Sequence, residues 1–392
     1  MKFSCMVTME DHVMAYGTWG KVGVWHILAK LKEHGISRVY WRSLGDGQSS
    51  YHSRLTENKC HIYPDEFPGY MPNYPSPESV DYINKVVNFD EIDMFKCARQ
   101  RCRDLGMEFI VWHEPRGEDH GNFLYSQFVK RYPQFLSIRD DGKRAYSELG
   151  WAFPEVMDRR VGLFREVVGY EPDGIYFDFV KSGDNIVSRL DENGYWRMGY
   201  EEPMVDGFKK KTGRDPHKIS NIDKEWLAYR AGYVTEYLKQ CRKIRDTFYP
   251  DVKLGLFAMQ PKYSAAHMGI EENRRLTYYP EDSLGNLEDH DTWISEGLIE
   301  TYTVGHNCRI EFDVLKSVGD QINMAKKRLK GKVKLNLQVE TYTNRETYAK
   351  EWLEKLVTIA EREKFGEIIL RETCPMWTYQ NMWRAIKEIT GV

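Results

Sequence analysis

Eight short runs rich in β-branched and aromatic residues recur along the chain, and helical patterns separate them. This alternation of strand and helix continues over nearly the whole length of 392 residues. Two of the helical stretches end at a glycine just before the next strand, where helix C-termini commonly lie. The expected strands are residues 2–9, 37–44, 108–114, 174–180, 252–259, 299–304, 333–340 and 367–372.

Eight strands, each followed by a helix, predict an α/β fold of the (β/α)8 barrel type. The alternative is a doubly wound sheet, which would need a glycine-rich phosphate turn after the first strand; "MEDHVMAYGTWG" is not such a turn. No linker divides the chain, so we expect one catalytic barrel over residues 1–392. The long connections 45–86 and 114–152 follow strands, and such insertions lie at the C-terminal face of a barrel. We therefore expect both to wall the active-site mouth.

The composition excludes several classes of protein. With 41% hydrophobic residues, 29% charged residues and a formal charge of −3, the chain is typical of a globular protein without a general attraction to nucleic acid or membrane. It contains no run of 18 apolar residues and no signal-peptide pattern, so we expect a cytoplasmic protein. The seven cysteines include no CxxC pair, which favours reduced thiols. The oligomeric state is left open.

Charged side chains gather where the expected strands end. Inward-facing residues alternate along a barrel strand, and this alternation places Tyr176 and Asp178 on one side of the fourth strand and Glu340 on the inward side of the seventh. A charged group at the mouth requires a partner, water or a substrate. An alternative for Asp178 is an ion pair with an arginine that merely seals the barrel. The polar residues predicted to bind substrate are Arg42, His113, Glu114, Tyr176, Arg371 and Glu372.

Most glycoside hydrolases use two carboxylates on either side of the glycosidic bond that they cleave. We predict that Asp178 and Glu340 form this pair, with Glu372 and Glu114 in reserve. Which member donates the proton, and whether the reaction retains or inverts the anomeric configuration, is left open.

Aromatic residues make up 14% of the chain, and many lie beside glycine or proline in expected loops. Such rings can stack on sugars, and we predict this role for Trp151 and Trp377. The alternative is that loop rings pack the loops onto the barrel.

Residues 132–180, "YPQFLSIRDDGKRAYSELGWAFPEVMDRRVGLFREVVGYEPDGIYFDFV", resemble the glycosyl-hydrolase-like, family-10-like group of TIM-barrel proteins. The segments "EEPMVDGFKKKTGRDP" and "DTWISEGLIETYTV" are similar to later parts of that group, and the resemblance covers roughly residues 85–305. It implies a (β/α)8 fold and action on carbohydrate. Among the site residues it supports Asp178; Phe179 departs from the acidic residue or tyrosine that the group often has there. Matching positions are Pro133, Phe135, Leu136, Asp141, Gly142, Pro154, Glu155, Val156, Asp173 and Gly174.

Two other functions compete with a glycosidase. A metal-dependent barrel hydrolase or isomerase would need oxygen and nitrogen ligands near strand ends, although no HxH or HExxH spacing occurs. A barrel that binds sugar without chemistry is the other alternative. We expect a carbohydrate substrate, no metal and no cofactor, and the residues leave sugar, linkage and anomer open. The candidate ligands for a metal are Asp11, His12, His113, Glu114, Asp119, His120 and His306.

Overall fold

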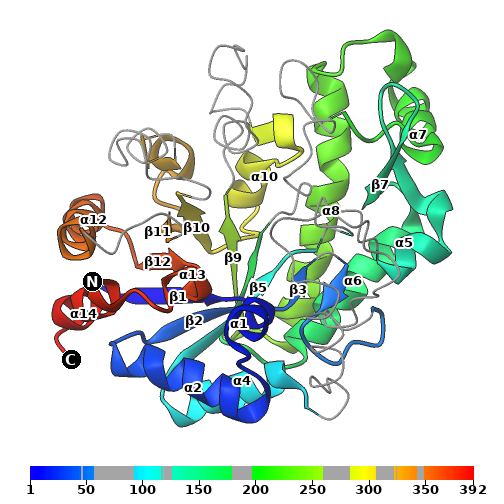
Figure 1. Ribbon diagram of the computed structural model, residues 1–392. Helices are drawn as coiled ribbons and strands as arrows, with labels where there is room; N and C mark the ends of the chain where they lie inside the picture. The colour runs from blue at the N-terminus through cyan, green and yellow to red at the C-terminus, as the bar shows by residue number, and fades with distance from the viewer. Residues whose placement is uncertain are drawn as a thin grey trace.

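Eight parallel strands form a closed barrel, and their order around the barrel follows the chain (Figure 1). The computed structural model describes residues 1–45, 47–56, 92–115, 118, 126–178, 197–258, 283–305, 322–323, 325–341 and 348–392. Each barrel strand falls within one of the eight expected runs, so the predicted (β/α)8 fold is confirmed. The strands are β1 (Phe3–Val7), β2 (Arg38–Arg42), β5 (Glu108–His113), β8 (Gly174–Phe177), β9 (Lys253–Phe257), β10 (Thr301–Val304), β11 (Lys334–Glu340) and β12 (Ile368–Arg371).

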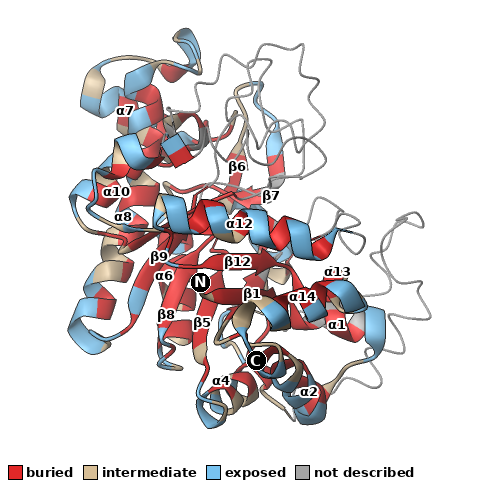
Figure 2. Ribbon diagram, turned by 90° about the vertical axis from the view of Figure 1, so that its left-hand side faces the viewer, coloured by how far each residue is buried: buried red, intermediate tan, exposed pale blue. Residues whose placement is uncertain are grey.

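Helices surround the barrel, with their apolar faces toward the strands. In α12 the buried residues recur every three or four positions, as a helix with one apolar face requires. Figure 2 shows buried strands and the exposed outer face of α12. The helices are α1 (Met9–Tyr16), α2 (Gly20–Glu33), α4 (Met94–Asp104), α5 (Gln127–Arg131), α6 (Pro154–Val168), α7 (Glu202–Thr212), α8 (Lys224–Phe248), α10 (His290–Ser295), α12 (Ala349–Glu363), α13 (Thr373–Met376) and α14 (Gln380–Thr390). Short 3₁₀ turns are η2 (Pro133–Phe135), η4 (Pro216–Lys218) and η5 (Ser283–Asn286).

Inward and outward side chains alternate along the barrel strands. Leu337 and Val339 of β11 join the large core shared with the helices, whereas Asn336 lies inside the barrel. Tyr176 is also inside, and Gly255 leaves it room: a Cβ at that position would lie 2.5 Å from the tyrosine ring. The predicted alternation in β8 and β11 is thus confirmed for these residues. A separate apolar cluster fills the barrel centre and consists of Met6, Tyr40, Ile110, Trp112, Tyr176, Phe257 and Ile369.

A polar cluster lies below this apolar centre, at the N-terminal ends of the strands, and we call it the floor cluster. Its centre is Glu367, which is 1% exposed. Arg38 Nη1, Tyr40 Oη and Asn336 Nδ2 donate to Glu367 Oε1 at 2.6, 2.5 and 2.7 Å. Ser4 Oγ donates to Oε2 at 2.7 Å. Donors from three strands therefore meet at one carboxylate, which directly precedes the fourth strand, β12.

Arg38 extends the floor cluster to the rim of the barrel. Its Nε donates to Glu108 Oε2 at 2.6 Å, and Lys2 pairs with the same carboxylate. Burial alone would lower the pKa of Arg38, but Glu367, Tyr40 and Glu108 together outweigh burial, and the pKa lies above its usual value. Burial opposes ionisation of Glu108, yet hydrogen bonds from Arg38 and Lys2 lower its pKa to about 2.

A small extension stands beside the barrel on the side of α6 and α8 (Figure 1). It includes an antiparallel hairpin of β6 (Leu136–Ile138) and β7 (Arg144–Leu149), which lies within the second long connection and was not expected from the sequence. In the first connection, β3 (Leu44–Gly45) pairs with β4 (Gln48–Ser49). Residues 57–91, 116–117 and 119–125 lie outside the described residues. The walling of the mouth by 45–86 and 114–152 stays a prediction.

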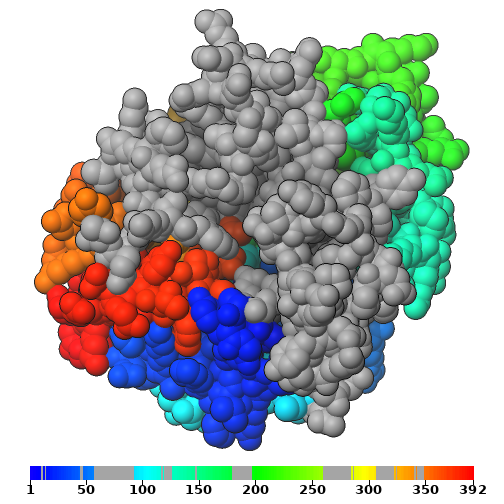
Figure 3. Space-filling view, in the orientation of Figure 1, coloured from blue at the N-terminus to red at the C-terminus, as the bar shows by residue number. Residues whose placement is uncertain are grey.

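The first and last strands of the barrel pair with each other. Phe3, Ser4 and Cys5 of β1 lie in parallel register with Ile368, Ile369 and Leu370 of β12. Figure 3 shows the blue N-terminal and red C-terminal segments side by side on one face. No helix in the described part of the chain is long and apolar enough to cross a membrane.

Candidate active site

Asp178 directly follows β8 and is fully buried. Trp112 Nε1, from the neighbouring strand β5, donates a hydrogen bond to Asp178 Oδ2 at 2.8 Å. Arg371 Nη1, from β12, lies 4.0 Å from the same oxygen. A hydrogen-bond donor and a cation on one oxygen stabilise a negative charge there. The arrangement therefore places a buried carboxylate, with a donor and a nearby cation at one oxygen, at the C-terminal end of the barrel.

Two arginines from opposite sides of β1 flank the indole of Trp112. The Cζ atoms of Arg42 and Arg371 each lie 5.2 Å from the ring centroid, within range of cation–π attraction. Arg42 Nη2 also pairs with Glu114 Oε2 at 2.7 Å, and both side chains are nearly buried. Arg42, Glu114 and Arg371 are thus brought together with Asp178, as the sequence predicts.

Glu372 begins the turn after β12 and is 4% exposed. Its Oε2 accepts a hydrogen bond from Thr8 Oγ1 at 3.0 Å, and its Oε1 lies 3.6 Å from Arg371 Nε. Thr341 Oγ1 donates to the Glu372 carbonyl oxygen at 2.8 Å. A third carboxylate therefore lies in the same ring of charges.

Glu340 is the last residue of β11, and its Cα pairs with that of Arg371 in β12. Its side chain lies outside the described part of the structure. The backbone thus places Glu340 at the same end of the barrel as Asp178. Its catalytic role stays a prediction.

His113 lies on the outer side of β5, away from the mouth where a substrate contact was expected. The ring is fully buried between Phe164 and Phe177. Nδ1 is 3.1 Å from Ser43 Oγ, and Nε2 is 3.2 Å from Tyr237 Oη. The reason is strand alternation: Trp112 and Glu114 face inward, so the residue between them faces the helices.

We expect His113 to make the fold sensitive to acid. Burial lowers its pKa from 6.5 to about 3, so the unfolded chain binds a proton in a pH range where the folded chain does not. The contribution of the neutral His113 ring to the free energy of unfolding is present above about pH 6.5. It is lost as the pH falls toward the pKa of His113 in the folded chain. Between pH 6.5 and 5.0 the contribution is about 2 kcal/mol. Urea unfolding of wild type and His113→Asn at pH 7.5 and 5.0 measures it; equal pH dependence in both would contradict the expectation.

Two aromatic residues of the predicted site, Tyr176 and Trp151, pack in the core. Tyr176 lies deep in the barrel, 3% exposed, with its ring 5.0 Å from that of Tyr40, and burial raises its pKa to about 12. Trp151 is 6% exposed and stacks under Arg160, whose Cζ is 3.5 Å from the ring centroid. Both were expected to bind substrate, and the structure places both in the core instead.

Trp377 lies outside the barrel, between α13 and α2. Lys30 Nζ is 4.0 Å from its ring centroid and donates to its carbonyl oxygen at 2.7 Å. The ring of His12 packs edge-on at 4.8 Å. The predicted stacking of Trp377 on sugar is therefore replaced here by stacking on a lysine.

The candidate metal ligands do not converge within the described residues, where no group of three histidine, cysteine or carboxylate side chains could hold an ion. His12 Nε2 lies 2.8 Å from Thr373 Oγ1, and burial lowers its pKa to about 4. Asp119, His120 and His306, and the side chain of Asp11, lie outside the described residues.

Trp112 is the site residue that the sequence analysis missed. The strand "EFIVWHE" drew attention to its two polar end residues, His113 and Glu114. Alternation, already applied to β8 and β11, would have selected Trp112 and Glu114 as the inward pair. The signal was therefore present in the sequence.

Neither a family model nor a curated protein matches the sequence. Solved structures do share the fold. The PgaB (BpsB) glycoside hydrolase domain from Bordetella bronchiseptica is 9% identical; the match covers 100% of this chain and 99% of that chain with a TM-score of 0.63. A beta-galactosidase from the psychrophilic Marinomonas ef1 is 11% identical over 100% of this chain and 59% of that chain, with a TM-score of 0.57.

A noncanonic maltogenic alpha-amylase, AmyB from Thermotoga neapolitana, is 9% identical over 99% of this chain and 76% of that chain, with a TM-score of 0.50. The TM-scores of these three matches establish that the barrel fold is shared with glycoside hydrolases. They do not place the chain in the family-10-like group that residues 132–180 resemble. Function must therefore be argued from the site.

Proposed function

We propose that this chain is a glycoside hydrolase that cleaves a glycosidic bond at the C-terminal mouth of its barrel. The observation that carries the proposal is Asp178, a buried carboxylate at the end of β8 that Trp112 and Arg371 hold at one oxygen. Active sites of (β/α)8 enzymes lie at this end of the strands. The fold shared with glycoside hydrolases supports the same reading.

The surroundings of Asp178 favour one of its two possible roles. Trp112 and Arg371 stabilise its negative charge, which suits a nucleophile or a base that activates water. The proton donor would then be a second carboxylate, and we assign this role to Glu340, with Glu372 and Glu114 in reserve. A sugar bound above Asp178 would offer hydroxyl groups to the Arg42–Glu114 pair.

The test is a panel of aryl glycosides and polysaccharides, with released aryl alcohol or reducing ends as the readout. We expect at least one to be cleaved, and we expect the activity to survive EDTA. The competing metal-dependent reaction predicts loss on chelation and recovery with Mn²⁺ or Zn²⁺. Sugar binding without cleavage of any panel member by freshly purified protein would instead support a non-catalytic barrel.

A further inference from the structure

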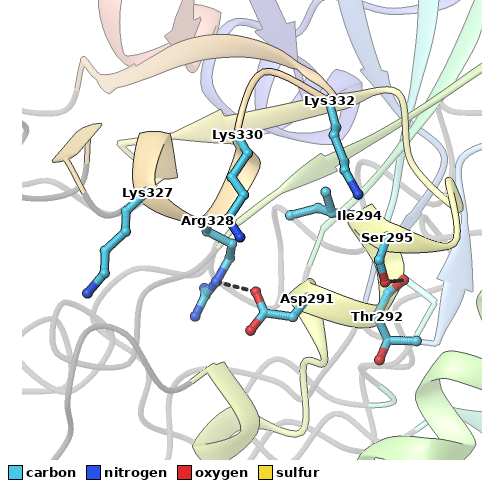
Figure 4. A pocket seen from close by; sticks show the side chains of 8 residues that line it. All are labelled: Asp291, Thr292, Ile294, Ser295, Lys327, Arg328, Lys330 and Lys332. Carbon is cyan, nitrogen blue, oxygen red and sulfur yellow. Dashed lines mark hydrogen bonds and ion pairs between the residues drawn. The ribbon is translucent and has the colours of Figure 1, made fainter.

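A basic hollow of about 500 Å³ lies on the side of the barrel between α10 and the helical residues 325–329 (Figure 4). Among the described residues, four cationic side chains and one carboxylate, that of Asp291, line it. The whole chain carries a formal charge of −3, so this cluster is a local feature. The residues that line the hollow are Asp291, Thr292, Ile294, Ser295, Lys327, Arg328, Lys330 and Lys332.

Two contacts fix the side chain of Arg328. Its Nε pairs with Asp291 Oδ1 at 3.0 Å, and its Nη1 lies 3.2 Å from Nδ1 of the buried His290. His290 is itself fixed by Glu288 Oε2 at 2.7 Å and Tyr302 Oη at 2.9 Å. A guanidinium positioned in advance loses little freedom when it binds an oxyanion.

Lys330 and Lys332 extend the positive charge past the hollow. Within the described residues no carboxylate lies within 4.0 Å of either ammonium group. Lys330 also lines a neighbouring hollow of about 480 Å³, together with Lys326, Lys334, Lys364 and Glu363, whose carboxylate pairs with Lys326. We call the two hollows together the basic strip. The basic strip lies near the N-terminal end of β11, whereas the mouth of the barrel lies at the C-terminal ends of the strands.

We propose that the basic strip binds an acidic polysaccharide, whose successive carboxylate or sulfate groups would occupy the two hollows. The shared Lys330 makes the positive charge continuous, and a chain with repeated anionic groups complements it. None of the described residues that line the two hollows is aromatic, and single-stranded nucleic acid is bound largely by base stacking on such residues. The strip is separate from the proposed catalytic site, so the inference stands independently of hydrolysis.

Binding of polygalacturonate and dextran sulfate, with neutral dextran as the reference, tests the proposal by microscale thermophoresis at low and physiological salt. We expect both acidic polymers to bind, neutral dextran not to bind, and salt to weaken the affinity. Lys330→Glu/Lys332→Glu should weaken binding about tenfold or more, because two attractive contacts become repulsive.

Lys210→Glu/Lys243→Glu is the matched control. It makes the same change in net charge at two exposed helical lysines of α7 and α8. This control should bind like wild type, and Asp178→Asn should do so too. Equal binding by both double variants, or equal affinity for neutral dextran, would overturn the proposal. So would tighter, equally variant-sensitive binding of poly-U RNA, which would identify a nucleic-acid site.

Discussion

Asp178→Asn is expected to lower turnover of any cleaved glycoside by about two orders of magnitude or more. Asparagine has nearly the same shape, and its amide oxygen can still accept the hydrogen bond from Trp112 Nε1. The fold should therefore survive while the charge is lost. The measurement is kcat for wild type and variant on the same substrate, with circular dichroism to confirm folding.

Glu340→Gln should reduce turnover to a similar extent if Glu340 is the proton donor. The two roles leave different signatures. A variant without its acid should keep more activity on substrates with good leaving groups, such as dinitrophenyl glycosides, and should lose the alkaline limb of the pH–rate profile. A variant without its nucleophile should be poor on all leaving groups.

Two results would contradict the roles assigned to Glu340 and Asp178. Near-full activity in Glu340→Gln would remove β11 from the mechanism and direct the search to Glu372, which already lies 3.6 Å from Arg371 Nε. Near-full activity in Asp178→Asn would instead identify Asp178 as a partner that only seals the barrel with Arg371.

Glu367→Ala is expected to destabilise the barrel by about 3–5 kcal/mol, because it removes the shared acceptor of the floor cluster. Arg38, Tyr40, Asn336 and Ser4 would each lose a hydrogen bond of 2.5–2.7 Å in a buried place. Unfolding in urea, followed by tryptophan fluorescence, gives the free energy of unfolding for comparison with wild type.

Glu388→Ala is the matched control for that prediction. Glu388 pairs with Lys350 at 2.7 Å on the outer surface, between α14 and α12. An exposed ion pair contributes little, so this variant should stay far closer to wild type. If both variants lose the same stability, the floor cluster is no more than an ordinary surface pair in its effect.

The order of the elements could be predicted because each barrel strand is a short local pattern. Alternation also predicted that Asp178 and Tyr176 share a side of β8, and the structure agrees. The prediction for His113 was wrong because alternation was not applied to β5, whose polar end residues were read without regard to side. Trp151 and Trp377 show the limit of counting loop aromatics, since a ring beside a turn packs onto the barrel as readily as it meets a ligand.

The floor cluster could not be predicted from local patterns. Its members come from three strands and from the residue that directly precedes β12, and the contact between Ser4 and Glu367 joins residues 363 positions apart. Glu367 stands at the start of a short apolar strand, where an exposed carboxylate would be unremarkable. Only the closed barrel brings four donors to Glu367. The cluster therefore depends on how distant strands align with one another, which local sequence patterns do not show.

The pairing of β1 with β12 has a consequence for how the protein is made. During synthesis β1 is made long before β12, so the edge of β1 that pairs with β12 has no partner in the barrel until residues 368–370 have left the ribosome; the opposite edge pairs with β2. An open parallel edge can pair with other chains. The barrel thus stays open until the last of its eight strands has been synthesised. Aggregation of chains truncated before residue 368 is the expected consequence of this topology.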